Sequence, residues 1–272
     1  MENLNFLSPI SLKRKIRLGP NKDGGYVLYE PALMNVDCLL TYGVGWDIDF
    51  EVDFYNLTGQ KVLMYDPTMF GEKYVNTSIC MNLLKQGRYL SLIKYLKHIY
   101  HWKMKLRNLE EYGIKFFNEG IANVTCHKYD TFYNQLHKNK IISNRILLKI
   151  DIEENEYLIF QNDNFMESLD LVDQMIVEFH NLKNRLRELE QIIHKLSKKY
   201  HIIHIHGNNA LPGFVFYRNS CDIYFPDIIE LTFLKKTSVL NEDVLFDILN
   251  YPDPKLDFPN VLRKDFERLI FD

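Results

Sequence analysis

Six short apolar runs, each ending at or beside a glycine or an acidic residue, constrain the fold of this chain more than any other feature. They are CLLTYG (38–43), KVLMYD (61–66), IKFFNEG (114–120), RILLKID (145–151), QMIVEF (174–179) and HIIHIHG (201–207). Their apolar residues are nearly continuous rather than alternating, which is typical of strands covered on both faces of a parallel sheet. We therefore predict six buried strands.

Helical stretches separate these runs, and the clearest covers residues 186–200, where apolar residues recur every three or four positions. Alternating strands and helices with right-handed crossovers predict a doubly wound α/β sheet. A ligand site of such a sheet lies beyond the carboxyl ends of its strands. Two further strand-like pieces follow at 213–217 and 228–233, and with no repeat or linker visible we predict one domain over residues 1–272.

The connection over residues 71–113 is unusually long, and it contains an aromatic and basic helical stretch at 89–109. We interpret 71–113 as a helical insertion that forms a lid or a partner surface, including a contact between copies in a homo-oligomer. A plain insertion of packed helices is an equal alternative, because aromatic residues at helical spacing are usually core. The mixture of basic and aromatic residues also suits phosphates or an anionic membrane surface.

Composition excludes several classes of protein. Thirty-three basic and 36 acidic residues give a net charge of −3, so no overall positive field favours a nucleic-acid partner. The four cysteines are spread widely, which fits neither a disulfide framework nor a zinc knuckle and suits a reducing cytoplasm. No apolar run approaches the ~20 residues of a membrane span, and we expect a cytoplasmic protein.

The first predicted strand leads into a glycine loop, in which Gly43 and Gly45 allow a tight turn close to a ligand. The second strand ends in Asp66, placed where an acidic side chain accepts hydrogen bonds from ribose hydroxyls. A dinucleotide fingerprint needs a further glycine, and Asp47 and Asp49 in this loop would repel a pyrophosphate. An acidic loop instead suits a cofactor with a positive centre, such as S-adenosylmethionine.

The motifs GVGWD (43–47), YD (65–66), LLKIDIEENEY (147–157) and IVEFH (176–180) together resemble the FkbM-type S-adenosylmethionine-dependent methyltransferases, a class I Rossmann-like family. RLGPNKDGGYVL (17–28) is similar to an element of members that act in surface polysaccharide pathways. The resemblance implies that Gly43, Gly45 and Asp66 bind the cofactor, with Glu119 or the backbone beside it near the adenine. The chain departs from the family at Glu154, where a glycine is usual.

Polar side chains gather at the carboxyl ends of the later strands. Asp151 ends one strand, Glu178 and His180 end the next, and His204 and His206 share one face of the third. Methyl transfer to a hydroxyl requires its proton to be removed, either by a metal-assisted route or by a histidine base. Asp151, Glu178 and His180 offer oxygen and nitrogen ligands suited to Mg²⁺ or Mn²⁺, as in some sugar methyltransferases that this chain resembles. His180 or His206 is the candidate base.

Each of these residues also has a structural interpretation. Asp151 fits a strand-end cap, Glu178 a partner of Arg185, His204 an interior histidine, and His206 a loop-structuring residue. Arg17 suits either a salt bridge to the cofactor or substrate, or an ordinary surface charge.

The function we expect is S-adenosylmethionine-dependent O-methylation of a sugar hydroxyl. The resemblance implies a nucleotide-linked sugar for capsule or another surface polysaccharide. Two alternatives remain: an NAD-type nucleotide-sugar oxidoreductase on the same sheet, and a noncatalytic scaffold that retains the fold.

Overall fold

The fold is described from a computed structural model of the chain. The structure describes residues 4–69, 77–110, 112–143, 145–218, 221–246, 250–266 and 268–271.

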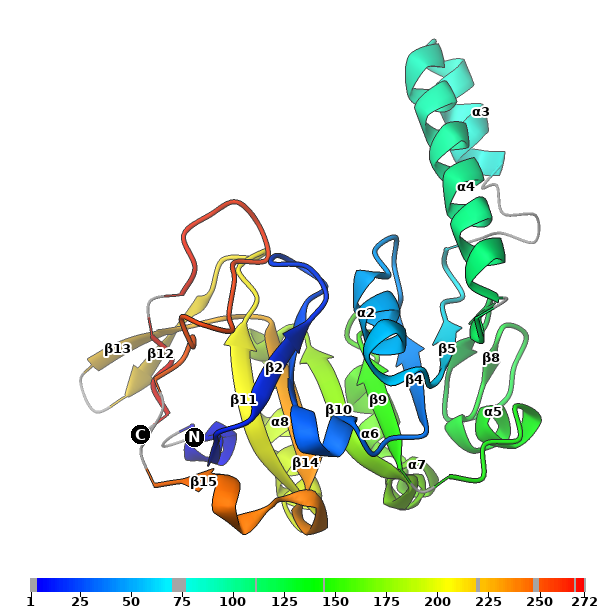
Figure 1. The fold of residues 1–272 in the computed structure, drawn as a ribbon. Coiled ribbons are helices and arrows are strands. Elements are labelled where there is room, and N and C mark those ends of the chain that lie inside the picture. The colour runs from blue at the N-terminus through cyan, green and yellow to red at the C-terminus, as the bar shows by residue number, and fades with distance from the viewer. Residues whose placement is uncertain are drawn as a thin grey trace.

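A seven-stranded sheet forms the centre of the molecule, with strand order β11-β14-β10-β9-β4-β5-β6 (Figure 1). Its strands are β4 (Cys38–Tyr42), β5 (Lys61–Tyr65), β6 (Ile114–Phe117), β9 (Ile146–Ile150), β10 (Val172–Phe179), β11 (Tyr200–Gly207) and β14 (Ile229–Lys235). β14 runs antiparallel to both of its neighbours, and the other adjacent pairs are parallel. This is the strand order of a Rossmann-like class I methyltransferase sheet.

The six strands predicted from the apolar runs all belong to this sheet. Their bounds agree with the predicted ones within a few residues, and the piece predicted at 228–233 supplies the antiparallel strand β14. The piece at 213–217 instead forms β12 (Phe214–Arg218), which pairs with β13 (Cys221–Phe225) in a separate hairpin. The doubly wound α/β prediction is therefore confirmed.

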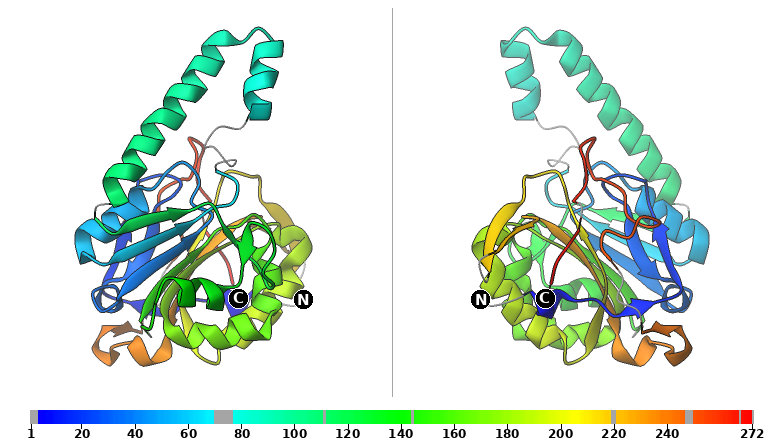
Figure 2. Two further views of the ribbon diagram at one scale, coloured as in Figure 1. Left: turned by 90° about the vertical axis from the view of Figure 1, so that its right-hand side faces the viewer. Right: turned by 90° about the vertical axis from the view of Figure 1, so that its left-hand side faces the viewer.

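Helices cover both faces of the sheet, as the side views show (Figure 2). One face packs against α5 (Phe132–Lys138), α6 (Glu156–Gln161), α7 (Asp163–Ser168) and α8 (Leu182–Leu196). The other face packs against α1 (Glu30–Leu33), α2 (Asp49–Thr58) and the β2–β3 hairpin (Lys15–Leu18 and Tyr26–Tyr29).

Helix α8 buries the apolar face that the sequence predicts, including Leu186, Leu189, Ile193 and Leu196. It begins earlier than the predicted residue 186 and ends at Leu196. Tyr200 is already the first residue of β11, and its hydroxyl donates to the carbonyls of the segment that leads into β10.

Two-residue strands complete the secondary structure: β1 (Ser11–Leu12) pairs with β15 (Val244–Leu245), and β7 (Gly120–Ile121) pairs with β8 (Tyr129–Asp130). Short 3₁₀ helices lie at Asn5–Leu7, Leu169–Leu171, Lys236–Ser238 and Asn241–Asp243.

Between β5 and β6, the chain forms a helical hairpin of α3 (Thr77–Lys85) and α4 (Tyr89–Glu110), which projects away from the sheet (Figures 1 and 2). The carboxyl-terminal part of α4 joins the core through Trp102 and Leu106. Residues 71–76 and 111 of the predicted insertion lie outside the described part of the chain. Among the helices described, none is long and apolar enough to cross a membrane.

Candidate active site at the sheet switch point

A cavity of about 690 Å³ lies beyond the carboxyl ends of β4, β5 and β9. The strand order reverses between β4 and β9, and this switch point is where open α/β sheets bind ligands. The predicted residues Gly43, Gly45, Asp66 and Asp151 all line the cavity. Its volume is within the range of small-molecule sites.

Gly43 lies at the switch point, where the backbones after β4 and β9 approach each other. Its φ of +74° is left-handed, and a Cβ on this residue would lie 1.5 Å from the carbonyl oxygen of Asp151. Its backbone nitrogen donates to the carbonyl of Tyr65 at 3.0 Å. Only glycine fits here, because both the conformation and the contact exclude a side chain.

Asp66 joins the ends of β4 and β5. Its carboxylate accepts the backbone N–H of Gly45 at 3.1 Å and, through its other oxygen, the hydroxyl of Thr68 at 2.7 Å. Asp66 is 4% exposed, yet it lines the cavity. The glycine loop and the acidic residue predicted to bind the cofactor are thus held together at one wall.

The structure places the side chain of Glu119 away from this wall. Glu119 pairs with Lys138 at 3.4 Å and does not line the cavity, whereas the adjoining backbone of residues 120–123 does. The resemblance implied either Glu119 or the backbone beside it near the adenine, and of these two the segment beside Glu119 lines the cavity.

Asp151, Glu178 and His180 converge beside the cavity from the ends of β9 and β10. One ligand atom from each lies within 4.8 Å of the others. The Nε2 atom of His180 is 3.4 Å from Glu178 and 3.8 Å from Asp151. The three residues predicted as metal ligands therefore form a cluster that could hold a cation.

Glu156 orients His180 from the opposite side of the ring. Its buried carboxylate lies 2.9 Å from Nδ1 of His180 and accepts the backbone N–H of Ile152 at 3.1 Å. Burial lowers the pKa of His180, but hydrogen bonds to Glu156 and Glu178 outweigh it and raise the pKa to about 11. This arrangement favours the protonated form of His180, which weighs against its prediction as the general base.

The two carboxyl groups of the cluster are harder to ionise than usual. Burial raises the pKa of Asp151 to about 6, although Lys149 and His180 oppose the shift. Burial and the charge of Asp151 raise the pKa of Glu178 to about 8. Burial is the main cause in both groups, because it disfavours the charged form of a carboxyl group.

Lys149 and Glu51 are site residues that the sequence did not reveal. Lys149 is 4% exposed, lines the cavity, and lies 3.8 Å from Asp151. Its Nζ lies 5.0 Å from the ring centroid of Tyr26. Burial lowers the pKa of Lys149, but Asp151 and Glu51 outweigh this and raise it, so Lys149 stays charged. A lysine within a buried strand, followed by an acidic strand end, was the available signal.

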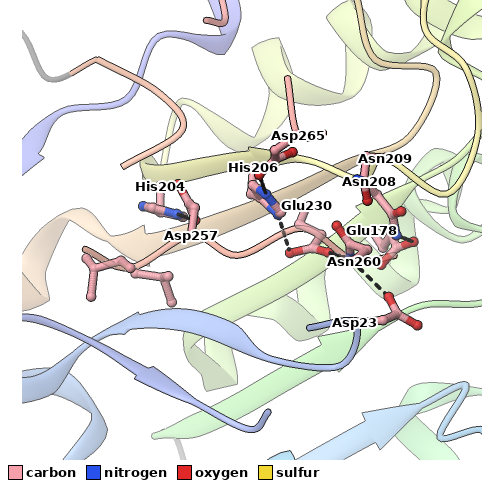
Figure 3. A network of polar contacts seen from close by, with 12 residues as sticks. Asp23, Glu178, His204, His206, Asn208, Asn209, Glu230, Asp257, Asn260 and Asp265 are labelled. Atoms are coloured by element: carbon pink, nitrogen blue, oxygen red, sulfur yellow. Dashed lines mark hydrogen bonds and ion pairs between the residues drawn. The ribbon is translucent and has the colours of Figure 1, made fainter. Parts of the chain in front are cut away.

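His206 is not at the cavity. It is 2% exposed and lies 3.4 Å from Glu230 and 3.2 Å from Asp265 (Figure 3). His204 is equally buried and lies 2.7 Å from Asp257. Beside these residues, Asn208 donates to Glu178 of the metal-ligand cluster at 3.1 Å (Figure 3). His206 therefore has no contact with the cavity that would let it act as the base.

Glu154 takes the backbone conformation that a glycine would favour. Its φ is +71°, and that of Glu153 is +54°. The Glu154 carboxylate accepts the side-chain amide of Asn181 at 3.0 Å and lies 3.6 Å from Arg185. These contacts hold Glu154 in a left-handed conformation that favours glycine.

Arg17 is not among the residues that line the cavity. Its guanidinium donates to the carbonyls of Pro20, Lys22 and Leu256. It holds the loop that brings Asp23 to the cavity.

Comparisons with known proteins identify structures but no family. No family model matches the chain, and no curated protein matches it. Two solved structures that are similar to it are the delta-N METTL16 MTase domain (10% identity, 74% of each chain, TM-score 0.34) and M. capricolum TrmK in complex with the natural cofactor product S-adenosyl-homocysteine (13% identity, 76% of this chain and 66% of that chain, TM-score 0.31). The class I arrangement rests on the chain's own strand order, and the FkbM resemblance stays a prediction.

Proposed function

We propose that this protein is an S-adenosylmethionine-dependent O-methyltransferase whose acceptor is a sugar hydroxyl, with a divalent cation at Asp151, Glu178 and His180. The observation that carries the proposal is the shared cavity. The Gly43–Gly45 loop, Asp66 and Asp151 of the metal-ligand cluster all line this one cavity. A nucleotide-linked sugar for a surface polysaccharide is the acceptor that the FkbM resemblance implies.

The cofactor wall favours a cationic ligand over a pyrophosphate. Asp47 and Asp66 both line the cavity, and Lys22 lies 3.1 Å from Asp47 outside the cavity lining. Asp66 would accept hydrogen bonds from the ribose hydroxyls, and the loop backbone would face the amino acid part. Bound S-adenosylmethionine supplies an electrophilic methyl group.

The metal-ligand cluster fits Mg²⁺ or Mn²⁺ by its chemistry. Two carboxylates and one imidazole are the mixed donors that these ions accept. Glu156 contacts Nδ1 of His180, so that Nε2 faces the carboxylates of Asp151 and Glu178. A metal-ligating histidine usually has such a partner on its other ring nitrogen. When bound, the cation lowers the pKa of a coordinated hydroxyl.

The chain's own residues position the reactants and accept the proton. Methyl transfer breaks the sulfur–carbon bond, forms an oxygen–carbon bond and releases the hydroxyl proton, and it requires the sulfur, the methyl carbon and the acceptor oxygen to lie in line. Lys149 holds Asp151 on the cavity side, and Glu156 holds His180. Asp151, the carboxylate of the cluster that lines the cavity, is the candidate to take the proton.

The test is transfer of labelled methyl groups from S-adenosylmethionine to a panel of nucleotide sugars. Protein treated with chelator should be inactive, and added Mn²⁺ or Mg²⁺ should restore transfer. Asp151→Asn should abolish transfer, whereas Asp163→Asn, a control whose side chain is 90% exposed on α7, should leave it unchanged. Full activity of Asp151→Asn, or activity that chelation does not affect, would contradict the metal-assisted proposal.

A further inference from the structure

Helix α4 carries a second apolar face that nothing in the described structure covers. Its buried face includes Ile99, Trp102 and Leu106. At 3.6 residues per turn, a separate stripe lies on another side of the helix. It consists of Tyr89, Ile93, Leu96, Tyr100 and Met104, with exposures from 39% for Met104 to 63% for Tyr89.

The neighbouring helix enlarges this apolar surface. Ile79, Met81 and Leu84 of α3 are also exposed, by between 41% and 52%. Together with the stripe on α4, they make the hairpin rich in exposed aliphatic and aromatic side chains. The hairpin itself projects from the rest of the chain (Figure 2). Exposed apolar side chains gathered on one projection mark an interaction site.

The charge of the hairpin identifies the chemistry of its partner. Residues 77–110 contain seven lysines and arginines and one acidic residue, Glu110 at the end of α4. The chain as a whole has a net charge of −3, so positive charge is concentrated on this one projection. Lys94 and Lys97 lie on α4 beside the stripe, and both are exposed. The partner must therefore accept apolar side chains and present negative charge.

We propose that the α3–α4 hairpin docks on the surface of a bilayer that contains anionic lipids. Exposed Leu, Ile, Met and Tyr side chains would enter the boundary between headgroups and acyl chains, and the lysines would contact the anionic headgroups. A second copy of the chain fits less well, because pairing two α4 stripes would bring two sets of cations together. This proposal does not depend on the methyltransferase proposal.

The experiment is co-sedimentation of the full chain with vesicles. Vesicles of equimolar phosphatidylcholine and phosphatidylglycerol should bind the protein, vesicles of phosphatidylcholine alone should bind it much more weakly, and high salt should release it. The triple variant Lys85→Gln, Lys94→Gln, Lys97→Gln should bind the anionic vesicles about a hundredfold more weakly, since each lysine near such a surface adds about 1 kcal/mol. Its matched control is Lys61→Gln, Lys183→Gln, Lys198→Gln, three exposed lysines elsewhere, which should bind as the wild type does.

The apolar stripe has its own test. Ile93→Ser, Leu96→Ser, Tyr100→Ser should weaken vesicle binding at least about tenfold, whereas Ile142→Ser, Leu211→Ser, Leu240→Ser, exposed apolar residues away from the hairpin, should not. Circular dichroism should show all four variants folded. Equal binding of wild type and both hairpin variants would overturn the proposal. Absence of vesicle binding would also overturn it. A dimer in sedimentation velocity that the stripe variant dissociates would then show that the surface joins two copies.

Discussion

Substitution of Gly43 by alanine should disrupt the switch point of the sheet more than substitution of Gly45, two residues further on. Both glycines have left-handed φ angles, +74° and +60°. An alanine Cβ at Gly43 would lie 1.5 Å from the carbonyl oxygen of Asp151, whereas one at Gly45 would meet nothing within 4 Å. The pair therefore separates the cost of backbone conformation from the cost of close approach.

The magnitudes follow from these two terms. A left-handed backbone costs an alanine about 1–2 kcal/mol, and this applies to both variants. At Gly43, moving the backbones after β4 and β9 apart adds about 1–3 kcal/mol, as overpacking of a core does. Alanine also restricts the unfolded chain, which offsets part of the loss in both variants. We therefore expect Gly45→Ala to lower the free energy of unfolding by about 1 kcal/mol and Gly43→Ala by about 1–4 kcal/mol.

Urea denaturation followed by circular dichroism measures the difference. With the same dependence on urea in both variants, the midpoint of Gly43→Ala should fall below that of Gly45→Ala by about one molar. Equal midpoints would refute the reasoning, because they would mean that the backbones after β4 and β9 do not meet at Gly43.

Three further predictions concern the site and the network behind it. Asp66→Asn should weaken binding of S-adenosylmethionine about 10- to 100-fold in calorimetry, because charged acceptors for the ribose hydroxyls are lost; unchanged affinity would remove Asp66 from the cofactor site. Binding of Mn²⁺ at neutral pH should release protons from His180 and Glu178, whose pKa values are raised to about 11 and about 8, because a ligating imidazole is neutral and a ligating carboxylate is ionised; the apparent enthalpy should then differ between buffers of different ionisation enthalpy, and equal enthalpies would contradict the assignment of these two residues as ligands. Burial lowers the pKa of His206, but Asp265 and Glu230 outweigh it and raise the pKa from 6.5 to about 10. The stabilisation from these ion pairs is thus complete below about pH 6.5 and is lost as the pH rises through about 10, by about a few kcal/mol. Urea midpoints over this range should fall less in His206→Gln than in the wild type, and parallel curves would exclude the ion pairs.

The sequence predicted the sheet because its strands are buried on both faces. Their nearly continuous apolar runs stand out, and their polar ends meet at one edge by topology alone. Strand topology predicts that Asp151, Glu178 and His180 converge at this edge, and in the structure one ligand atom from each lies within 4.8 Å of the others. Convergence at a strand end needs only strand direction and order.

Residues whose roles depend on distant partners could not be predicted in this way. Lys149 appears in the sequence as one polar residue inside a strand, and its charge is stabilised by Glu51 from a helix far earlier in the chain. His206 lies at a strand end like His180, but carboxylates from β14 and the carboxyl-terminal segment enclose it. Arg17 is held by carbonyls, which no residue pattern reveals. Helix α8 begins at Leu182, four residues before the predicted start, because Leu182 and Leu186 belong to one buried face.

The most direct test of the central claim is calorimetric titration of chelator-treated protein with S-adenosylmethionine and with S-adenosylhomocysteine, repeated with Mn²⁺ and with NAD as the control. Saturable binding of both sulfur ligands at one site per chain, and none of NAD, is the predicted result. Absence of binding by both sulfur ligands in either condition would contradict the methyltransferase account and favour a scaffold that retains the fold. Binding of NAD instead would favour the oxidoreductase.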